Sequence, residues 1–213
     1  MPKNRKKKDV RKKEFSLREE YAASWNFIKD SREFMYIAII GFAIFVVIGF
    51  FFEDVVNVIF KSLLGFDLRT NIITFLKSLV GKTDGMSQTQ IIGYLFVNNL
   101  KSSFSGMIFG IFFGLFSAFS LITNGYLLGF VAMISVREAG VLVLWRILPH
   151  GIFELPALFI ALGLGMKLGS HAFRPSKNSF KESFVESLRV FLLIIVPLLI
   201  IAAIIEGSLI YFS

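Results

Sequence analysis

The sequence has 213 residues, of which 55% are hydrophobic and 18% are charged, with 26 phenylalanines and a net charge of +8. Soluble domains are usually about 45–50% apolar and about 25% charged, so this composition excludes an ordinary soluble domain and predicts an integral membrane protein. The chain contains no cysteine, which excludes disulfides, zinc–thiolate sites and thiol nucleophiles.

Residues 1–33 carry 11 of the 23 lysines and arginines, including four consecutive basic residues from Arg5. Because basic segments beside a membrane span stay in the cytoplasm, we predict a cytoplasmic tail that also attracts anionic lipid headgroups. The same placement argues against nucleic acid as a partner. Tyr21, Trp25 and Ile28 share one helix face, which predicts an amphipathic juxtamembrane helix. A plain extension of the first span is the alternative.

The remaining residues, 34–213, are predicted to form an all-α transmembrane bundle with about five crossings. The first apolar run contains no charge, and its 19 residues at about 1.5 Å each approach the thickness of the hydrocarbon core. The more polar segment 53–97 predicts amphipathic helices on the outer surface, with an extramembrane helical hairpin as the alternative. The predicted spans are 34–52, 99–122, 125–147, 149–168 and 190–211.

Charge also predicts the orientation of the chain in the cell membrane. The segment 167–189 carries five basic residues against two acidic ones, so it is expected to be a cytoplasmic loop. An even number of crossings must then separate the N-terminus from this loop, and four spans satisfy that condition. The fifth span places the C-terminus outside.

Glycines recur at four-residue spacing within these spans. Such patterns let another helix backbone approach closely, which matters because lipid supplies no hydrophobic drive for helix association. The glycines expected to pack against other helices are Gly106, Gly110, Gly114, Gly125, Gly129, Gly165 and Gly169.

The third span is predicted to be broken near residues 125–148. The apolar run that starts at Tyr126 has eleven residues, which cover about half of a bilayer. Irregular backbone at this depth must pack within protein or face a wet cavity. Two half-helices and one kinked helix both fit the pattern. The residues expected to break or kink helices are Asn124, Pro149, Gly151 and Pro156.

Ionisable residues gather in the same region. His150 and Glu154 are four residues apart and share a helix face. A carboxylate between apolar neighbours inside a membrane needs a partner. We therefore predict a buried polar core, which either locks the helices together or forms a functional site. Its members are Arg137, Glu138, Arg146, His150 and Glu154.

Three classes of function fit this pattern to different extents. A metal site needs three or four ligands, and the two histidines lie at opposite ends of one predicted span, so we predict no metal, no cofactor and no catalytic residue. An intramembrane hydrolase would need a second catalytic group beside Glu154, and the sequence places none there. Half-helices with buried charges are typical of transporters, which keeps a small transporter or channel open.

The run LPHGIFELPA at residues 148–157, together with Asn124-Gly125, Gly129 and Gly140, resembles the stage II sporulation protein M family. The pattern from Tyr21 to Arg32 resembles archaeal-type members, and the similarity covers nearly the whole chain. The resemblance implies a membrane scaffold, which in sporulating bacteria recruits peptidoglycan-degrading partners during engulfment. We therefore expect a non-enzymatic scaffold that recruits envelope proteins or forms a homo-oligomer.

Overall fold

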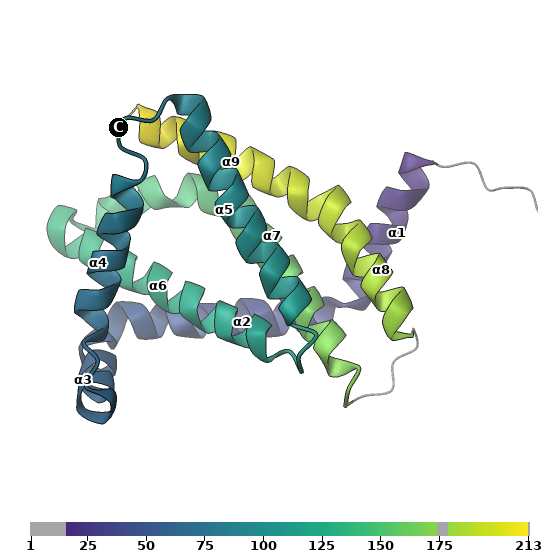
Figure 1. The fold of residues 1–213 in the computed structure, drawn as a ribbon, viewed down its shortest axis with the longest axis horizontal. Coiled ribbons are helices and arrows are strands. Elements are labelled where there is room, and N and C mark those ends of the chain that lie inside the picture. The colour runs from purple at the N-terminus through teal and green to yellow at the C-terminus, as the bar shows by residue number, and fades with distance from the viewer. Residues whose placement is uncertain (1–15, 174–178, 213) are drawn as a thin grey trace, which may run out of the picture.

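The computed structural model describes the backbone of residues 16–173 and 179–212 (Figure 1). Side chains are described over the same ranges except at 79–80 and 146–150. The basic run at Arg5 therefore lies outside the described residues. Every regular element within these ranges is a helix, which confirms the predicted all-α class.

The helices follow one another with short connections. In chain order they are α1 (Leu17–Asp30), α2 (Arg32–Phe51), α3 (Glu53–Leu64), α4 (Leu68–Gly81), α5 (Gln88–Phe109), α6 (Leu115–Ala139), the 3₁₀ turn η1 (Val141–Val143), α7 (Leu144–Ser170), α8 (Phe180–Val190), the π-helical turn η2 (Phe191–Ile195) and α9 (Val196–Tyr211).

Four segments of the described chain are long and apolar enough to cross a membrane, which identifies an integral membrane protein. They are α2, α6, the part of α7 from Gly151 to Ser170, and the continuous rod from α8 to α9. The π-helical turn in that rod comes just before Pro197, which has no backbone N–H to donate. The 22-residue α5 is long enough as well, but Asn98, Asn99 and Lys101 make it more polar than these four.

The bundle has two distinct ends. In Figure 1, α2 and α6 run side by side, and α5, α7 and α9 cross above them. The hairpin of α3 and α4, together with the C-terminus, lies at one end, which we call the hairpin end. The helix α1 packs against α8 at the opposite end, which we call the N-terminal end.

The helix α7 forms the centre of the bundle, because it packs against α2, α5, α6 and α9. Half of its membrane-spanning part is buried, a larger share than in the other three candidate spans. Ala157, Ala161, Leu162 and Leu164 are completely buried. Small alternating with large apolar side chains let neighbouring helices approach α7 closely.

The crossing of α2 and α6 depends on glycine. A Cβ atom on Gly129 would lie 2.1 Å from the Val46 carbonyl oxygen, and one on Gly49 would lie 2.2 Å from the Tyr126 carbonyl oxygen. A Cβ atom on Gly125 would likewise lie 2.8 Å from the Phe42 carbonyl oxygen of α2. Backbone therefore touches backbone at this crossing, and no side chain fits between the helices.

A second glycine contact joins α5 and the α5–α6 turn to α7. A Cβ atom on Gly169 would lie 2.1 Å from the Gly114 nitrogen, and one on Gly110 would lie 2.6 Å from the Gly165 carbonyl carbon. Beside this contact, the hydroxyl of Ser117 in α6 donates to the Gly106 carbonyl oxygen of α5 at 2.8 Å. The structure thus places the glycines named from the sequence at contacts between helices.

The turn between the second and third spans differs from the sequence expectation. The chain turns at residues 110–114, inside the predicted span 99–122, because Phe113 and Gly114 adopt left-handed φ values of 57° and 73°. The helix α6 then continues through Asn124, whose amide donates to the Ser120 carbonyl oxygen at 2.7 Å. The Asn124-Gly125 pair therefore lies inside α6 and not in a turn, and Gly125 packs against α2. The outer segment is also shorter than 53–97, since α5 begins at Gln88.

The helix break lies at Gly140, within the predicted interval 125–148. Its φ of 78° ends α6, and the turn η1 leads directly into α7. The helix α7 continues through Pro149, Gly151 and Pro156, so these positions do not interrupt it as expected. A proline in a membrane helix is tolerated when neighbouring helices pack around the freed backbone group.

Candidate functional site

A polar cavity of about 70 Å³ lies between α5, α6 and α7. Glu154 of α7 lines it and is half-buried. The other lining residues are Asn98, Asn99, Ser102 and Ser103 of α5, Asn124 of α6, and Leu158 of α7. We call this space the Glu154 cavity.

The helices position these side chains through their apolar neighbours. Leu158, one turn after Glu154, is buried in the cluster that also contains Ala38 and Phe42 of α2, which fixes the rotation of α7. The asparagines lie near the middle of α5. Polar side chains inside a membrane bundle turn toward one another, because lipid offers them no hydrogen-bond partner.

The Glu154 cavity is lined by one carboxyl group, three carboxamides and two hydroxyls. Its volume exceeds the roughly 30 Å³ that one water molecule occupies in the liquid, so it has room for water or a small cation. Oxygen-rich sites of this kind suit hard cations. Among the described residues, no group of three His, Cys, Asp or Glu side chains is arranged to hold a metal ion.

The structure separates the predicted polar core. Arg137 and Glu138 are exposed at the hairpin end, so the expectation that they are buried is corrected: α6 ends one residue later, beyond the packed part of the bundle. The side chains of Arg146 and His150 lie outside the described residues. Of the five residues, the structure therefore places Glu154 in the bundle, and it surrounds this residue with asparagines and serines.

Arg137 belongs instead to an ion cluster at the hairpin end. Glu53 is 2% exposed, and the Arg69 Nε donates to its Oε2 atom at 3.1 Å. The Arg69 Nη2 also contacts the carboxylates of Glu53 and Asp54, and the Arg137 Nη1 lies 3.5 Å from Glu53 Oε1. The cluster thus joins the start of α3, the start of α4 and the end of α6.

Further hydrogen bonds and charges fix the turn between α3 and α4. The Arg69 hydrogen bond lowers the pKa of Asp54, and the hydrogen bond from the Thr70 backbone lowers the pKa of Asp67. Lys61 lies 3.2 Å from Asp67 and lowers the same pKa further. Both aspartates are therefore charged at neutral pH, as their ion pairs with Arg69 and Lys61 require.

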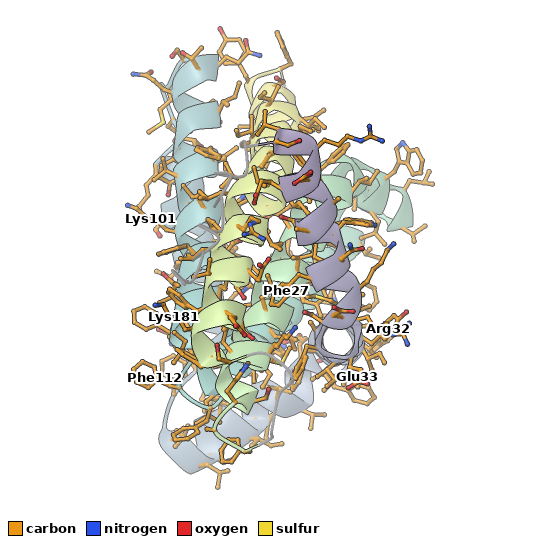
Figure 2. The ribbon with its side chains drawn as sticks, turned by 90° about the vertical axis from the view of Figure 1, so that its right-hand side faces the viewer. Phe27, Arg32, Glu33, Lys101, Phe112 and Lys181 are labelled. Atoms are coloured by element: carbon orange, nitrogen blue, oxygen red, sulfur yellow. The ribbon has the colours of Figure 1, made fainter. Side chains whose placement is uncertain are left out.

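A third polar contact closes the N-terminal end. The Lys167 side chain of α7 is 9% exposed and donates to Ser31 Oγ at 2.7 Å. Its ammonium group also lies 3.8 Å from the centre of the Phe27 ring, a cation–π contact. Figure 2 shows Phe27 between α1 and the bundle, whereas Arg32 and Glu33 lie on the outer side of the chain. The contact ties α7 to the corner between α1 and α2.

Sequence reasoning missed most of these partners. Glu53 begins the polar segment 53–97, and nothing in the sequence around it connects it to Arg69, 16 positions later. The polar run from Asn98 to Ser103 was a usable signal, because five of its six residues are polar in a stretch that is otherwise apolar.

Sequence comparisons show which known proteins this chain is similar to. A sequence profile of the stage II sporulation protein M family matches residues 30–209. A relative from Methanocaldococcus jannaschii, described as uncharacterized, is 34% identical over 119 residues, which cover 53% of this chain and 66% of the relative. This chain therefore matches less than two thirds of that relative's own length. No solved structure matches significantly.

Proposed function

Because the chain belongs to the stage II sporulation protein M family, we propose that it is a non-enzymatic integral membrane scaffold that recruits or organises other envelope proteins. In this proposal α5 is a fifth crossing, the N-terminal end faces the cytoplasm and the hairpin end lies outside. The positive-inside rule supports this orientation, because basic residues gather at the N-terminal end. They include Lys29, Arg32, Lys167, Lys181 and Arg189.

The observation that supports a scaffold is the apolar surface of α3. Val55, Val58, Ile59 and Leu63 lie on one face of this helix and are exposed, Leu63 to 77%. The polar side of α3 is turned to α4, because the Arg69 backbone N–H of α4 donates to Asn57 Oδ1 of α3 at 3.0 Å. The apolar face of α3 therefore points away from the bundle and is available to another protein.

We expect Val58→Ser and Leu63→Ser together to release envelope partners without unfolding the chain. Both side chains are exposed, 65% and 77%, so their loss removes little packing inside the bundle. Partner binding would weaken roughly tenfold or more, since each buried apolar side chain contributes about 1.5–3 kcal/mol. The measurement uses a photoreactive reagent attached to a single cysteine that replaces Ile59. After illumination in native membranes, the crosslinked proteins are identified by mass spectrometry.

The matched control is Ile40→Ser, an exposed apolar position on α2 away from the hairpin. The control should leave the crosslinked proteins unchanged. If cysteine at Ile59 labels lipid alone, with and without the two substitutions, α3 rests in the membrane surface and the scaffold proposal fails at this surface.

The Glu154 cavity favours a second candidate, a small transporter or channel. A carboxyl group with carboxamides at the centre of a bundle is the kind of polar site that membrane transporters use for ions. The cavity could hold one small cation at a time, given its volume of about 70 Å³. Conduction would require a path from the cavity to both ends of the bundle.

The two candidates predict different results for Glu154→Gln. For the scaffold, purified protein in liposomes passes no more Na⁺ or K⁺ than empty liposomes do, and Glu154→Gln lowers the amount of folded protein because it disturbs a half-buried polar group. For the transporter, the wild-type protein passes the ion and Glu154→Gln abolishes the flux at an unchanged protein level. Glu138→Gln, at an exposed position, is the control for both measurements.

A further inference from the structure

The helix α5 carries a polar stripe that the rest of the described chain leaves largely exposed. Asn98, Lys101 and Ser102 are exposed on one side of this helix, and Ser105 continues the stripe half-buried. Figure 2 shows Lys101 directed outward, away from the bundle. Within the described part of the chain, the ammonium group of Lys101 forms no hydrogen bond or ion pair.

The stripe lies deep in the hydrocarbon layer if α5 crosses the membrane. Lys101 is eight residues before the end of the helix at Phe109, which corresponds to about 12 Å of helix. A lysine side chain can extend part of this distance toward the headgroups. Asn98 and Ser102 are too short to do so. A charged or hydrogen-bonding group that faces lipid at this depth is unfavourable, so the stripe needs a cover.

The chemistry of the stripe suits a copy of itself. It presents a cation at Lys101 and the oxygen acceptors of Asn98 and Ser102, and it borders the Glu154 cavity, which those two residues also line. A two-fold axis along the membrane normal keeps corresponding residues at the same depth. Each Lys101 can then meet the acceptors and the acidic cavity of the other copy, since a two-fold contact pairs residue i with j and j with i.

We propose that α5 is the contact between two copies of this chain, with the polar stripe of one copy packed against that of the other. Asn98, Lys101, Ser102 and Ser105 recur at spacings of three, one and three residues. This spacing places them on the narrow face that two parallel helices bury when they pack as a left-handed pair. The second copy removes all four side chains from lipid at once.

Cysteine crosslinking tests the contact directly, because the natural chain contains no cysteine. We expect single variants Asn98→Cys and Ser102→Cys to form disulfide-linked dimers in native membranes under mild oxidation. Ile40→Cys, an exposed apolar position on α2, should give roughly tenfold less dimer. Equal dimer from all three positions, or none from α5, would overturn the proposal.

A charge reversal separates a specific contact from chance collision. We expect Lys101→Glu in the Ser102→Cys background to reduce the crosslinked dimer by about tenfold, because the new carboxylate would then face the acidic Glu154 cavity of the other copy. Lys101 is exposed, so the thermal stability of the monomer in detergent should not change. Undiminished crosslinking in this double variant, or a crosslink to a different protein in place of a second copy, would contradict the proposed dimer.

Discussion

Replacing Gly129 by alanine is expected to destabilise the bundle by about 3 kcal/mol or more. The new methyl group would lie 2.1 Å from the Val46 carbonyl oxygen and 2.9 Å from the Phe50 nitrogen, and neither backbone atom can move without separating α2 from α6. The loss of stability should appear as a lower unfolding midpoint in detergent and as less protein in the membrane.

Gly93→Ala is the matched control for this substitution. Gly93 lies in α5 with open space around its Cβ position, so alanine there should stabilise the helix by up to about 1 kcal/mol. If both substitutions changed the unfolding midpoint equally, helix propensity would explain the result and the close crossing of α2 and α6 would not.

Glu53→Ala should release the α3–α4 hairpin from the bundle. Removing one partner of a buried ion pair costs about 3–5 kcal/mol when the other partner stays buried. The Arg69 and Arg137 side chains are 38% and 61% exposed and can be solvated after the change, so we expect about 2 kcal/mol. Amide hydrogen exchange should become faster along α4 and stay nearly unchanged in α7, which would show that only the hairpin is released.

Asp54→Ala provides the comparison, because Asp54 contacts the same arginine but is 68% exposed. Exposed ion pairs contribute little, so the hairpin should stay attached in this variant. If Asp54→Ala accelerated exchange in α4 as much as Glu53→Ala, burial of the Glu53 carboxylate would not be the reason for the attachment.

The sequence predicted those features of the fold that the bilayer itself imposes. The uncharged run 34–52 corresponds closely to α2, and the last run to α9, because the hydrocarbon core fixes how many apolar residues a span needs. The segment 99–122 was interpreted as one span because its residues are mostly apolar from Phe104 onward. Its turn depends on the left-handed Gly114, which packs against Gly169, 55 positions later in the sequence.

The candidate site was predictable to a smaller extent. Glu154 could be identified from its immediate sequence neighbours, because a carboxyl group between apolar residues of a membrane span is unusual. Its neighbours Asn98 and Asn124 come from two other helices, and their convergence follows from how α5, α6 and α7 pack. The same reason hid the Glu53–Arg69 pair: long-range contacts follow from tertiary packing, which residue spacing does not report.

The contact between Lys167 and Ser31 has a consequence for the order of events during synthesis. The two residues are 136 positions apart, and the lysine belongs to the last turns of α7. The segments between them must leave the ribosome and enter the bilayer before this contact can form. The corner between α1 and α2 can therefore be closed by Lys167 only after α2 to α7 have been synthesised.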